Sequence, residues 1–376
     1  MKVLHVGKFY WPVRGGIENH MKVLCEGLIK RGVSVRAVVS NKDGKLVREK
    51  INGVEVVRLP KIMSVFNQPI FVGLRKEIED YGPDLIHIQL PNPLAALKIM
   101  DVKIPIIASY QSDIVGKPQV ATQILDFYTK QLLQRSYRIL PSSENYAKFS
   151  KMLMGFKNKI TVVPLSVEID KFRPIKKAKI KELRESLGIS DEFIILFVGR
   201  LIPYKGVNFL LKALPMMSGN YKIIIVGDGP LMRPLKSLAR ELSADDRVIF
   251  FGEADDDTLP ILYEMCDIFV LPSHMRSEAF GIVQMEAMVR RKPVVSCNIP
   301  GSGVQWVNKN GESGIVVEPE NPKDLADAIS RLMYSPVLRK KMGSGGRKRV
   351  EKYFDSQKMV KDILDIYKQA VKQRYC

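Results

Sequence analysis

Two kinds of hydrophobic pattern alternate along the chain. Short runs of almost uninterrupted apolar residues, such as residues 2–6 and 268–271, predict strands that are buried on both faces. Between them lie longer segments with apolar residues three or four positions apart, and this spacing predicts helices, the first beginning at Ile17. The alternation of strand and helix implies parallel sheets with right-handed crossovers.

The predicted elements fall into two series. In the first half of the chain, strands are expected at residues 2–6, 33–40, 54–58, 104–110, 138–141 and 161–164, and helices from residue 17, within 61–82 and over 119–135. In the second half, strands are expected at residues 193–199, 222–226, 248–251, 268–271, 294–296 and 314–317. Its expected helices cover residues 207–214, 231–242, 259–264, 282–290, 322–334, 336–353 and 357–372.

This repetition predicts two domains. A chain of 376 residues is long for one domain and sufficient for two of about 150–200 residues each. We expect an α/β protein with two Rossmann-like, doubly wound parallel-sheet domains, at residues 1–170 and 171–357. Such sheets bind ligands beyond the carboxyl ends of their strands, so the expected site is an interdomain cleft.

The composition indicates the cellular location that we expect for the protein. The sequence has no run of about 20 uncharged apolar residues, so no transmembrane helix is expected. Residues 1–7 are typical of a short strand and not of a signal peptide. The four cysteines are scattered without a Cys-x-x-Cys pair, which favours a reducing, cytoplasmic location and disfavours a cysteine metal site.

The charge is strongly basic and unevenly distributed. Residues 1–175 hold 27 Lys and Arg against 15 Asp and Glu, a net charge of +12, whereas residues 176–376 carry +7. No Arg-rich run or interleaved aromatic platform is present, so a nucleic-acid partner is not expected. Two interpretations stay open for the basic first half: peripheral contact with an anionic membrane, or a lysine-rich surface without a partner.

The most informative stretch follows the predicted strand 268–271. Two carboxylates, Glu278 and Glu286, lie on either side of an expected helix start near residue 281. The first backbone N–H groups of a helix are unpaired and carry its positive dipole end, so they suit a ligand with hydroxyls and phosphate. The amides concerned are those of Phe280, Gly281 and Ile282. An ordinary acidic helix start is the competing interpretation.

Two cations follow the first strand of the second domain. Arg200 and Lys205 emerge at the expected carboxyl end of strand 193–199. Together they can neutralise a diphosphate and stabilise negative charge on a leaving group. Metal binding is not expected, because no Asp-x-Asp pair follows a strand and the three acids at 255–257 precede a helix, where acids serve as caps.

Two backbone-rich loops are further candidates. Gly15 and Gly16 form a strand-to-helix turn after the first strand, where the absence of side chains lets the backbone approach a phosphate closely. A plain tight turn is the alternative. A second such loop follows strand 294–296 and contains Ser302, Gly303 and Val304.

These motifs resemble the signature of the family-4 retaining glycosyltransferases of the GT-B fold. The resemblance rests on Glu278 and Glu286 around Phe280-Gly281, on the pair Arg200 and Lys205, and on the two glycine loops, and it extends over nearly the whole chain. It implies that the first domain faces the acceptor, that the second binds a nucleotide sugar, and that a last helix near residues 358–376 crosses back to the first.

The resemblance also implies roles for single residues. Arg200 and Lys205 would grip the donor phosphates, Glu278 would hold the transferred sugar, and Glu286 would accept hydrogen bonds from the ribose. The glycine loops would lie near the diphosphate. On the acceptor and sugar side it points to Asn92, Gln111 and Asp113.

One position departs from the family pattern. A histidine often precedes Ser-Asp in this family, but this sequence has Gln111 there, and Gln89 stands at a second such position. Glutamine can hydrogen-bond a sugar hydroxyl but cannot carry a proton. No histidine base is therefore expected at that point, and His87 is interpreted as a packing residue at a strand end.

The expected function follows from the resemblance. It is the metal-independent, cofactor-free transfer of a sugar, with retained configuration, from a nucleoside-diphosphate donor to a lipid-linked or growing glycan. The runs 91–94, 112–115 and 276–283 resemble the bacterial subgroup that builds surface polysaccharides, which favours GDP-mannose over a UDP-sugar. A sugar-nucleotide epimerase of the same fold and a weakly catalytic donor-binding partner remain alternatives.

Overall fold

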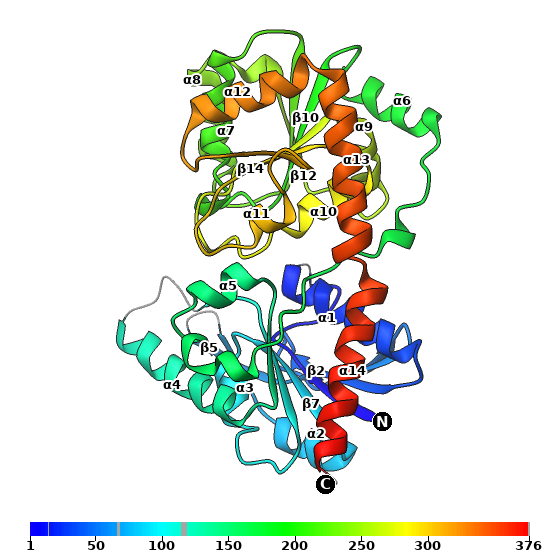
Figure 1. Cartoon of the computed structure of the whole chain (residues 1–376), viewed down its shortest axis with the longest axis vertical. Helices are drawn as coiled ribbons and strands as arrows, with labels where there is room; N and C mark the ends of the chain where they lie inside the picture. Colours follow the sequence, from blue (N-terminus) through cyan, green and yellow to red (C-terminus); the bar gives the residue numbers. More distant parts are fainter. Residues whose placement is uncertain (14, 66–67, 114–118, 375–376) are drawn as a thin grey trace. The chain divides into compact units, whose positions relative to one another are not determined.

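The chain forms two compact units. The structure, a computed structural model, describes residues 1–13, 15–65, 68–113 and 119–374 (Figure 1). One unit comprises Met1–Ser166 together with Ser356–Cys376, and the other comprises Val167–Asp355. These divisions lie close to the predicted ones at 170/171 and 357/358, and the last helix belongs to the first unit. Which unit binds donor and which binds acceptor remains a prediction.

The first unit is built on a mostly parallel sheet. Its strands are β1 (Lys2–Val6), β2 (Ser34–Ser40), β3 (Val47–Ile51), β4 (Val54–Leu59), β7 (Leu85–Leu90), β8 (Ile106–Tyr110) and β9 (Arg138–Pro141). They lie in the order β3-β4-β2-β1-β7-β8-β9, and within this sheet only β3 is antiparallel to its neighbour. The strands β5 (Lys61–Val65) and β6 (Gln68–Phe71) form a separate hairpin.

Helices connect these strands. They are α1 (Gly16–Ile29), α2 (Leu74–Tyr81), α3 (Pro93–Leu97), α4 (Gln119–Arg135), α5 (Glu144–Phe149) and the returning α14 (Ser356–Arg374). The helices α1, α2, α3 and α4 lie on crossovers, because parallel strands cannot be joined by a tight turn, whereas α5 follows the last strand and α14 returns from the second unit.

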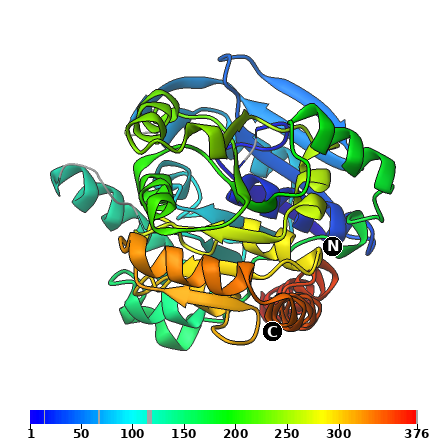
Figure 2. The same cartoon turned by 90° about the horizontal axis from the view of Figure 1, so that it is seen from above.

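The second unit repeats this plan with a fully parallel sheet. Its strands are β10 (Phe193–Val198), β11 (Tyr221–Val226), β12 (Val248–Gly252), β13 (Ile268–Leu271), β14 (Val294–Cys297) and β15 (Gly314–Val317), in the order β12-β11-β10-β13-β14-β15. Helices lie on both sides of this sheet (Figures 1 and 2). They are α6 (Lys177–Ser186), α7 (Val207–Ala213), α8 (Met232–Glu241), α9 (Thr258–Met265), α10 (Ile282–Val289), α11 (Val304–Val307), α12 (Pro322–Met333) and α13 (Pro336–Tyr353).

The two sheets share one topology. If the parallel strands of each unit are numbered along the chain, both sheets follow the order 3-2-1-4-5-6. Strand order reverses between the first and fourth strands, which are β1 and β7 in one unit and β10 and β13 in the other. Ligands of this fold bind beyond the carboxyl ends of the strands, at this point of reversal.

One sequence expectation about the first unit is wrong, and two further features of this unit were not expected. No strand forms at residues 161–164; the amides of Thr161 and Val163 each donate one bond to β9, and Pro164 has no N–H with which to continue the ladder. The edge strand β3 was not expected, because its charged, exposed residues lack a hydrophobic run. Residues 61–82 hold the hairpin β5–β6 before the short helix α2.

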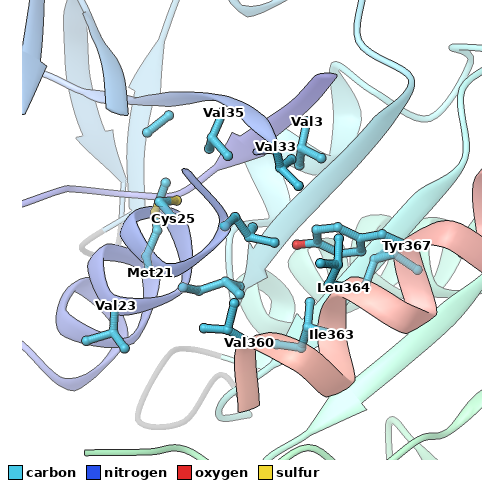
Figure 3. Packing of buried hydrophobic residues seen from close by; sticks show 14 of the residues in the cluster. Val3, Met21, Val23, Cys25, Val33, Val35, Val360, Ile363, Leu364 and Tyr367 are labelled. Carbon is cyan, nitrogen blue, oxygen red and sulfur yellow. The ribbon is translucent and has the colours of Figure 1, made fainter. Parts of the chain in front are cut away.

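The core of the first unit shows why α14 belongs to it. Along α14, Val360, Ile363, Leu364 and Tyr367 pack among buried residues of α1 and the central strands (Figure 3). A Cβ atom at Gly27 of α1 would lie 2.5 Å from Val360 Cγ2, so only glycine lets the helices approach this closely. Each large aliphatic side chain buried in this way contributes about 1.5–3 kcal/mol.

A buried polar chain fixes α14 to the sheet. The Tyr367 hydroxyl hydrogen-bonds His87 Nδ1, and His87 Nε2 lies 2.8 Å from Ser109 Oγ. His87 also stacks on His5 of β1, with ring centroids 4.3 Å apart. The expectation that His87 packs in the interior is supported, but it lies within β7 and not at the strand end.

Burial keeps the imidazoles of His5 and His87 neutral, and also that of His20, a buried residue of α1. It lowers the pKa of His5 to about 3 and that of His20 to about 4, and it places the pKa of His87 well below 6.5. Because the pKa of each is lower in the folded than in the unfolded chain, their contribution to stability is complete above pH 6.5. It is lost as the pH falls from 6.5 towards the folded pKa.

Replacing one of these histidines should therefore weaken the pH dependence of stability. The wild type should lose about 2 kcal/mol per buried histidine between pH 6.5 and 5, and His5→Gln should lose that much less. Urea unfolding followed by circular dichroism at pH 5 and 7.5 measures this difference. The pH 7.5 values supply the pH-independent cost of the substitution, and equal losses in both proteins would refute the assignment.

Candidate functional site

The loops after β10 and β13 meet at the switch point of the second unit. The loop after β10 carries Arg200 and Lys205, and the loop after β13 carries Glu278. Lys205 Nζ lies 2.5 Å from Glu278 Oε2, and the Ser273 hydroxyl donates to the same oxygen at 2.9 Å. The structure thus brings together the predicted cation and carboxylate from segments 73 residues apart.

This ion pair is largely withdrawn from solvent. The side chains of Lys205 and Glu278 are 12% and 10% exposed. Burial lowers the pKa of Lys205, but the Glu278 carboxylate and the Tyr204 phenol outweigh burial and raise it overall. Lys205 is consequently a full cation at neutral pH, while Arg200 is exposed at the start of the same loop.

The two loops are locked together by backbone contacts. Gly206 has φ +69°, and a Cβ atom there would lie 2.1 Å from the Pro272 carbonyl oxygen, so no other residue fits without displacement. The backbone N–H of His274 donates to the Tyr204 carbonyl at 3.1 Å. Its ring contacts the Pro203 carbonyl at 3.1 Å and Glu320 at 2.6 Å. Sequence reasoning missed His274, although it lies within the key stretch after β13.

The start of α10 lies where it was predicted. Gly281 caps the helix in the left-handed conformation, with φ +74°, and Ile282 begins it. The Phe280 ring is buried against Trp306 and Phe354, with centroids 5.9 Å from each. Phe280 therefore serves the core with its side chain, and only its backbone remains for the predicted contact with a ligand.

Glu286 is held by a residue that sequence reasoning missed. The Tyr263 hydroxyl donates to Glu286 Oε2 at 2.7 Å. Burial raises the pKa of Glu286, and the hydrogen bond from Tyr263 opposes that rise. Tyr263 lies on α9, and its apolar surroundings in the sequence give no sign of this role.

Residues of the loop after β14 form hydrogen bonds with one another and with the segment that carries Glu278. The Ser302 hydroxyl donates to the Glu278 carbonyl at 2.5 Å and accepts from the Val304 amide at 3.1 Å. The Gly303 amide donates to the Ala279 carbonyl at 2.8 Å. These residues position the Glu278 segment, and their direct contact with a ligand remains a prediction.

The first unit gathers the other predicted residues at one edge of its sheet. Gly15 and Gly16 follow β1, Asn92 follows β7, and Gln111 and Asp113 follow β8. Asn92 is fully buried, and neither polar atom of its amide has a hydrogen-bond partner among the described residues. A buried amide without partners is costly and points to a group supplied from outside.

The remaining residues at this edge have internal partners. Gln111 is buried, and its Nε2 donates to Gln89 Oε1 at 3.3 Å, while Gln89 Nε2 lies 2.7 Å from His5 Nε2. Asp113 Oδ1 accepts from Tyr110 at 2.8 Å and from Ser150 at 2.6 Å. The last two residues of the run 112–115 lie outside the described residues.

At the glycine turn before α1, the carboxylate of Glu18 would compete with a ligand anion for the backbone N–H groups of the helix start. Glu18 hydrogen-bonds its own backbone N–H at the start of α1, and burial raises the pKa of its carboxyl group. An anion at this helix start must displace that carboxylate. The predicted phosphate contact of Gly15 and Gly16 remains a prediction.

The described residues offer neither a cluster of metal ligands nor a membrane-spanning helix. They contain no group of three or more His, Cys, Asp or Glu side chains placed to hold a metal ion. Among the same residues, no helix combines the length and the apolar character needed to cross a membrane.

Known proteins resemble the chain along its whole length. Residues 14–171 match the family described as Glycosyltransferase Family 4, and residues 179–349 match Glycosyl transferases group 1. The O-antigen chain mannosyltransferase C of Escherichia coli is 28% identical over 98% of this chain and 98% of its own length. A D-rhamnosyltransferase of Pseudomonas aeruginosa is 30% identical, with coverages of 94% and 92%.

The fold is shared with solved structures. Sucrose-phosphate synthase of Thermosynechococcus elongatus matches with a TM-score of 0.82 and 21% identity, over 98% of this chain and 99% of that one. At this level of identity the likeness shows the fold alone.

The contact at Gly206 can be tested against a glycine of similar conformation. Gly188 also has a positive φ, +64°, but a Cβ atom there meets nothing within 4 Å. Gly188→Ala should cost about 1–2 kcal/mol of backbone strain. Gly206→Ala should cost about 1–3 kcal/mol more, because the Pro272 carbonyl must move. Urea unfolding compares the two variants, and equal costs would contradict the contact.

Proposed function

Because the chain belongs to the family 4, group 1 glycosyltransferases, we propose that it transfers a sugar from a nucleoside diphosphate to a lipid-linked or growing glycan, with retained configuration and without a metal ion. Its enzymatic class is that of a glycosyltransferase with the GT-B fold. GDP-mannose is the favoured donor, supported by the resemblance to the surface-polysaccharide subgroup and by the mannosyltransferase relative. A UDP-sugar is the competing donor.

The observation that carries the proposal is the ion pair between Lys205 and Glu278. Glu278 Oε2 holds the lysine and the Ser273 hydroxyl, and Oε1 has no hydrogen bond among the described residues. That free oxygen suits a sugar hydroxyl, while Lys205 and Arg200 suit the diphosphate. The pair thus positions adjacent partners for the two halves of an activated sugar.

The reaction assigns each group one task. The bond between the anomeric carbon and the diphosphate oxygen breaks, and a bond to the acceptor oxygen forms on the same face of the sugar. Lys205 and Arg200 stabilise the charge on the leaving diphosphate, as a metal ion would in other enzymes. The acceptor proton passes to a leaving phosphate oxygen, so the chemistry does not require a base at Gln111.

Two further residues support binding. Glu286, oriented by Tyr263, suits two ribose hydroxyls, because a carboxylate accepts both at once. The unpartnered amide of Asn92 suits a hydroxyl of the transferred sugar or of the acceptor.

A second function is favoured by one observation. Gln111 and Gln89 hydrogen-bond each other where the family often has histidines. Neither can move a proton, so a reaction that relied on a base here, and not on the leaving phosphate, would leave the protein a donor-binding partner with weak catalysis.

A panel of UDP-, GDP- and ADP-sugars separates these functions. Transfer predicts slow release of free nucleotide without acceptor, preferably from GDP-mannose, and a rate unchanged by EDTA. Interconversion of the donor would instead indicate an epimerase, and binding with neither reaction would indicate the partner role. Inhibition by EDTA that added metal reverses would contradict the metal-independent mechanism.

Removing either member of the ion pair should abolish most turnover. Lys205→Ala and Glu278→Gln should each lower kcat by about 100-fold or more, because each removes a group placed at developing charge. A single substitution can destabilise a buried pair, so the double variant, which leaves no unpaired charge, accompanies them. The same substitutions at an exposed ion pair of this unit, Lys181→Ala and Glu185→Gln, are the matched controls. Turnover near the wild-type rate in the folded variants would refute the assigned roles.

Loss of the Tyr263 hydroxyl should weaken nucleotide binding. Tyr263→Phe removes the bond to Glu286, so the affinity for GDP should fall by about tenfold. The same change raises the pKa of Glu286 further, so affinity should decline at a higher pH than in the wild type. Calorimetric titration across pH measures both effects. Tyr221→Phe, which removes another buried hydroxyl of this unit, is the control, and an unchanged affinity would contradict the role.

A further inference from the structure

The first unit has a pocket at the opposite edge of its sheet from the predicted ligand groups. The pocket holds about 580 Å³ and lies at the amino ends of β8 and β9. Asn92 and Gln111, in contrast, follow the carboxyl ends of β7 and β8. A parallel sheet separates these two edges by the length of its strands, so the pocket is not part of the reaction site.

Four of the twelve residues that line this pocket are cations. They come from three separate stretches of the chain, and no Asp or Glu lines the pocket. They are Lys103 before β8, Arg135 at the end of α4, Arg138 at the start of β9 and Lys159 at the end of the 3₁₀ helix Met154–Lys159.

These cations lack acidic partners. Among the described residues, none of the four forms an ion pair, whereas Arg36 and Arg58 of the same unit each pair with a glutamate. Lys159 Nζ donates to the Ser136 carbonyl at 3.0 Å, and Arg138 Nη1 donates to the Tyr137 carbonyl at 3.2 Å. Carbonyl oxygens satisfy donors but leave the positive charge uncompensated.

The neighbouring positive charges act on the pKa of Lys159. Burial lowers the pKa of its ammonium group, and repulsion from Arg135 and Arg138 lowers it further. An anion in the pocket would relieve this repulsion. The Arg138 guanidinium lies 4.8 Å from the centre of the neighbouring Tyr137 ring, a contact that orients the cation.

Capping of α4 does not explain the whole cluster. Lys159 donates to the carbonyls of Gln134 and Ser136 at the end of α4, which is an ordinary helix-capping arrangement, whereas Arg135 donates to the Val102 carbonyl in the segment before β8. Lys103 does not take part in the capping, and Arg138 bonds only to the carbonyl of its neighbour. The amides of Asn158 and Gln373 add neutral donors to the lining.

We propose that this pocket binds a phosphate or pyrophosphate group, at a second site distinct from that of sugar transfer. A pocket that is lined by several cations and by no acids suits an oxyanion with multiple negative charges. The planar guanidinium groups can donate two parallel hydrogen bonds to such an oxyanion. The group can belong to a soluble phosphate compound or to the headgroup of a phosphorylated lipid. Gln373 of α14 lines the pocket, so occupancy also stabilises the docking of that helix.

The test titrates the full chain with pyrophosphate. Lys103→Gln with Arg138→Gln should weaken binding by about tenfold or more, because two charged contacts are lost. Lys76→Gln, an exposed cation of the same unit away from the pocket, is the matched control. Lys205→Ala should leave this binding event in place, so the result does not depend on the proposed function. The single variant Lys103→Gln, at an exposed position, guards against a folding defect in the double variant.

Vesicle sedimentation supplies the second arm. Binding to phosphatidylglycerol–phosphatidylcholine vesicles is compared with binding to phosphatidylcholine alone for the same variants. A loss confined to pyrophosphate assigns the site to soluble phosphates, and a tenfold loss on the anionic vesicles assigns it to a lipid headgroup. If the pocket substitutions change neither pyrophosphate nor vesicle binding relative to Lys76→Gln, the proposal is wrong.

Discussion

The buried ion pair between Lys205 and Glu278 is the interaction on which the second unit's site depends. Burying two charges costs several kcal/mol for each ion, so the pair persists only with good geometry and extra hydrogen bonds. Ser273 supplies one such bond to the carboxylate, and Ser302 fixes the backbone that carries it. Each charge compensates the other, and under the proposed function a diphosphate and a sugar replace these mutual contacts.

The sheet topology makes that pairing possible. Lys205 and Glu278 lie far apart in sequence, but reversal of strand order places the loops after β10 and β13 side by side. Gly206 then allows the two backbones to touch. In the first unit, the same topology brings Asn92 and Gln111 to the carboxyl ends of two adjacent strands. The helix α14 packs on the core of this unit and contacts β7 through the hydrogen bond from Tyr367 to His87.

The sequence predicted these features unequally, for physical reasons. Strands such as β13 and β15 are uninterrupted apolar runs, so their limits were predicted to the residue. The strand β3 and the helix α6 have few or no buried residues, so no hydrophobic pattern revealed them. The predicted site residues were recognised by motif, but Tyr263 and His274 act through contacts between distant segments. The basic pocket was likewise invisible, because its four cations meet only in the folded unit.

The most direct measurement is a crystal structure of the protein with a bound nucleoside diphosphate sugar. We expect the diphosphate to contact Lys205 and Arg200, and a sugar hydroxyl to donate to Glu278 at the carboxyl ends of β10 and β13. A nucleotide bound elsewhere, with the contact between Lys205 and Glu278 undisturbed, would contradict this expectation.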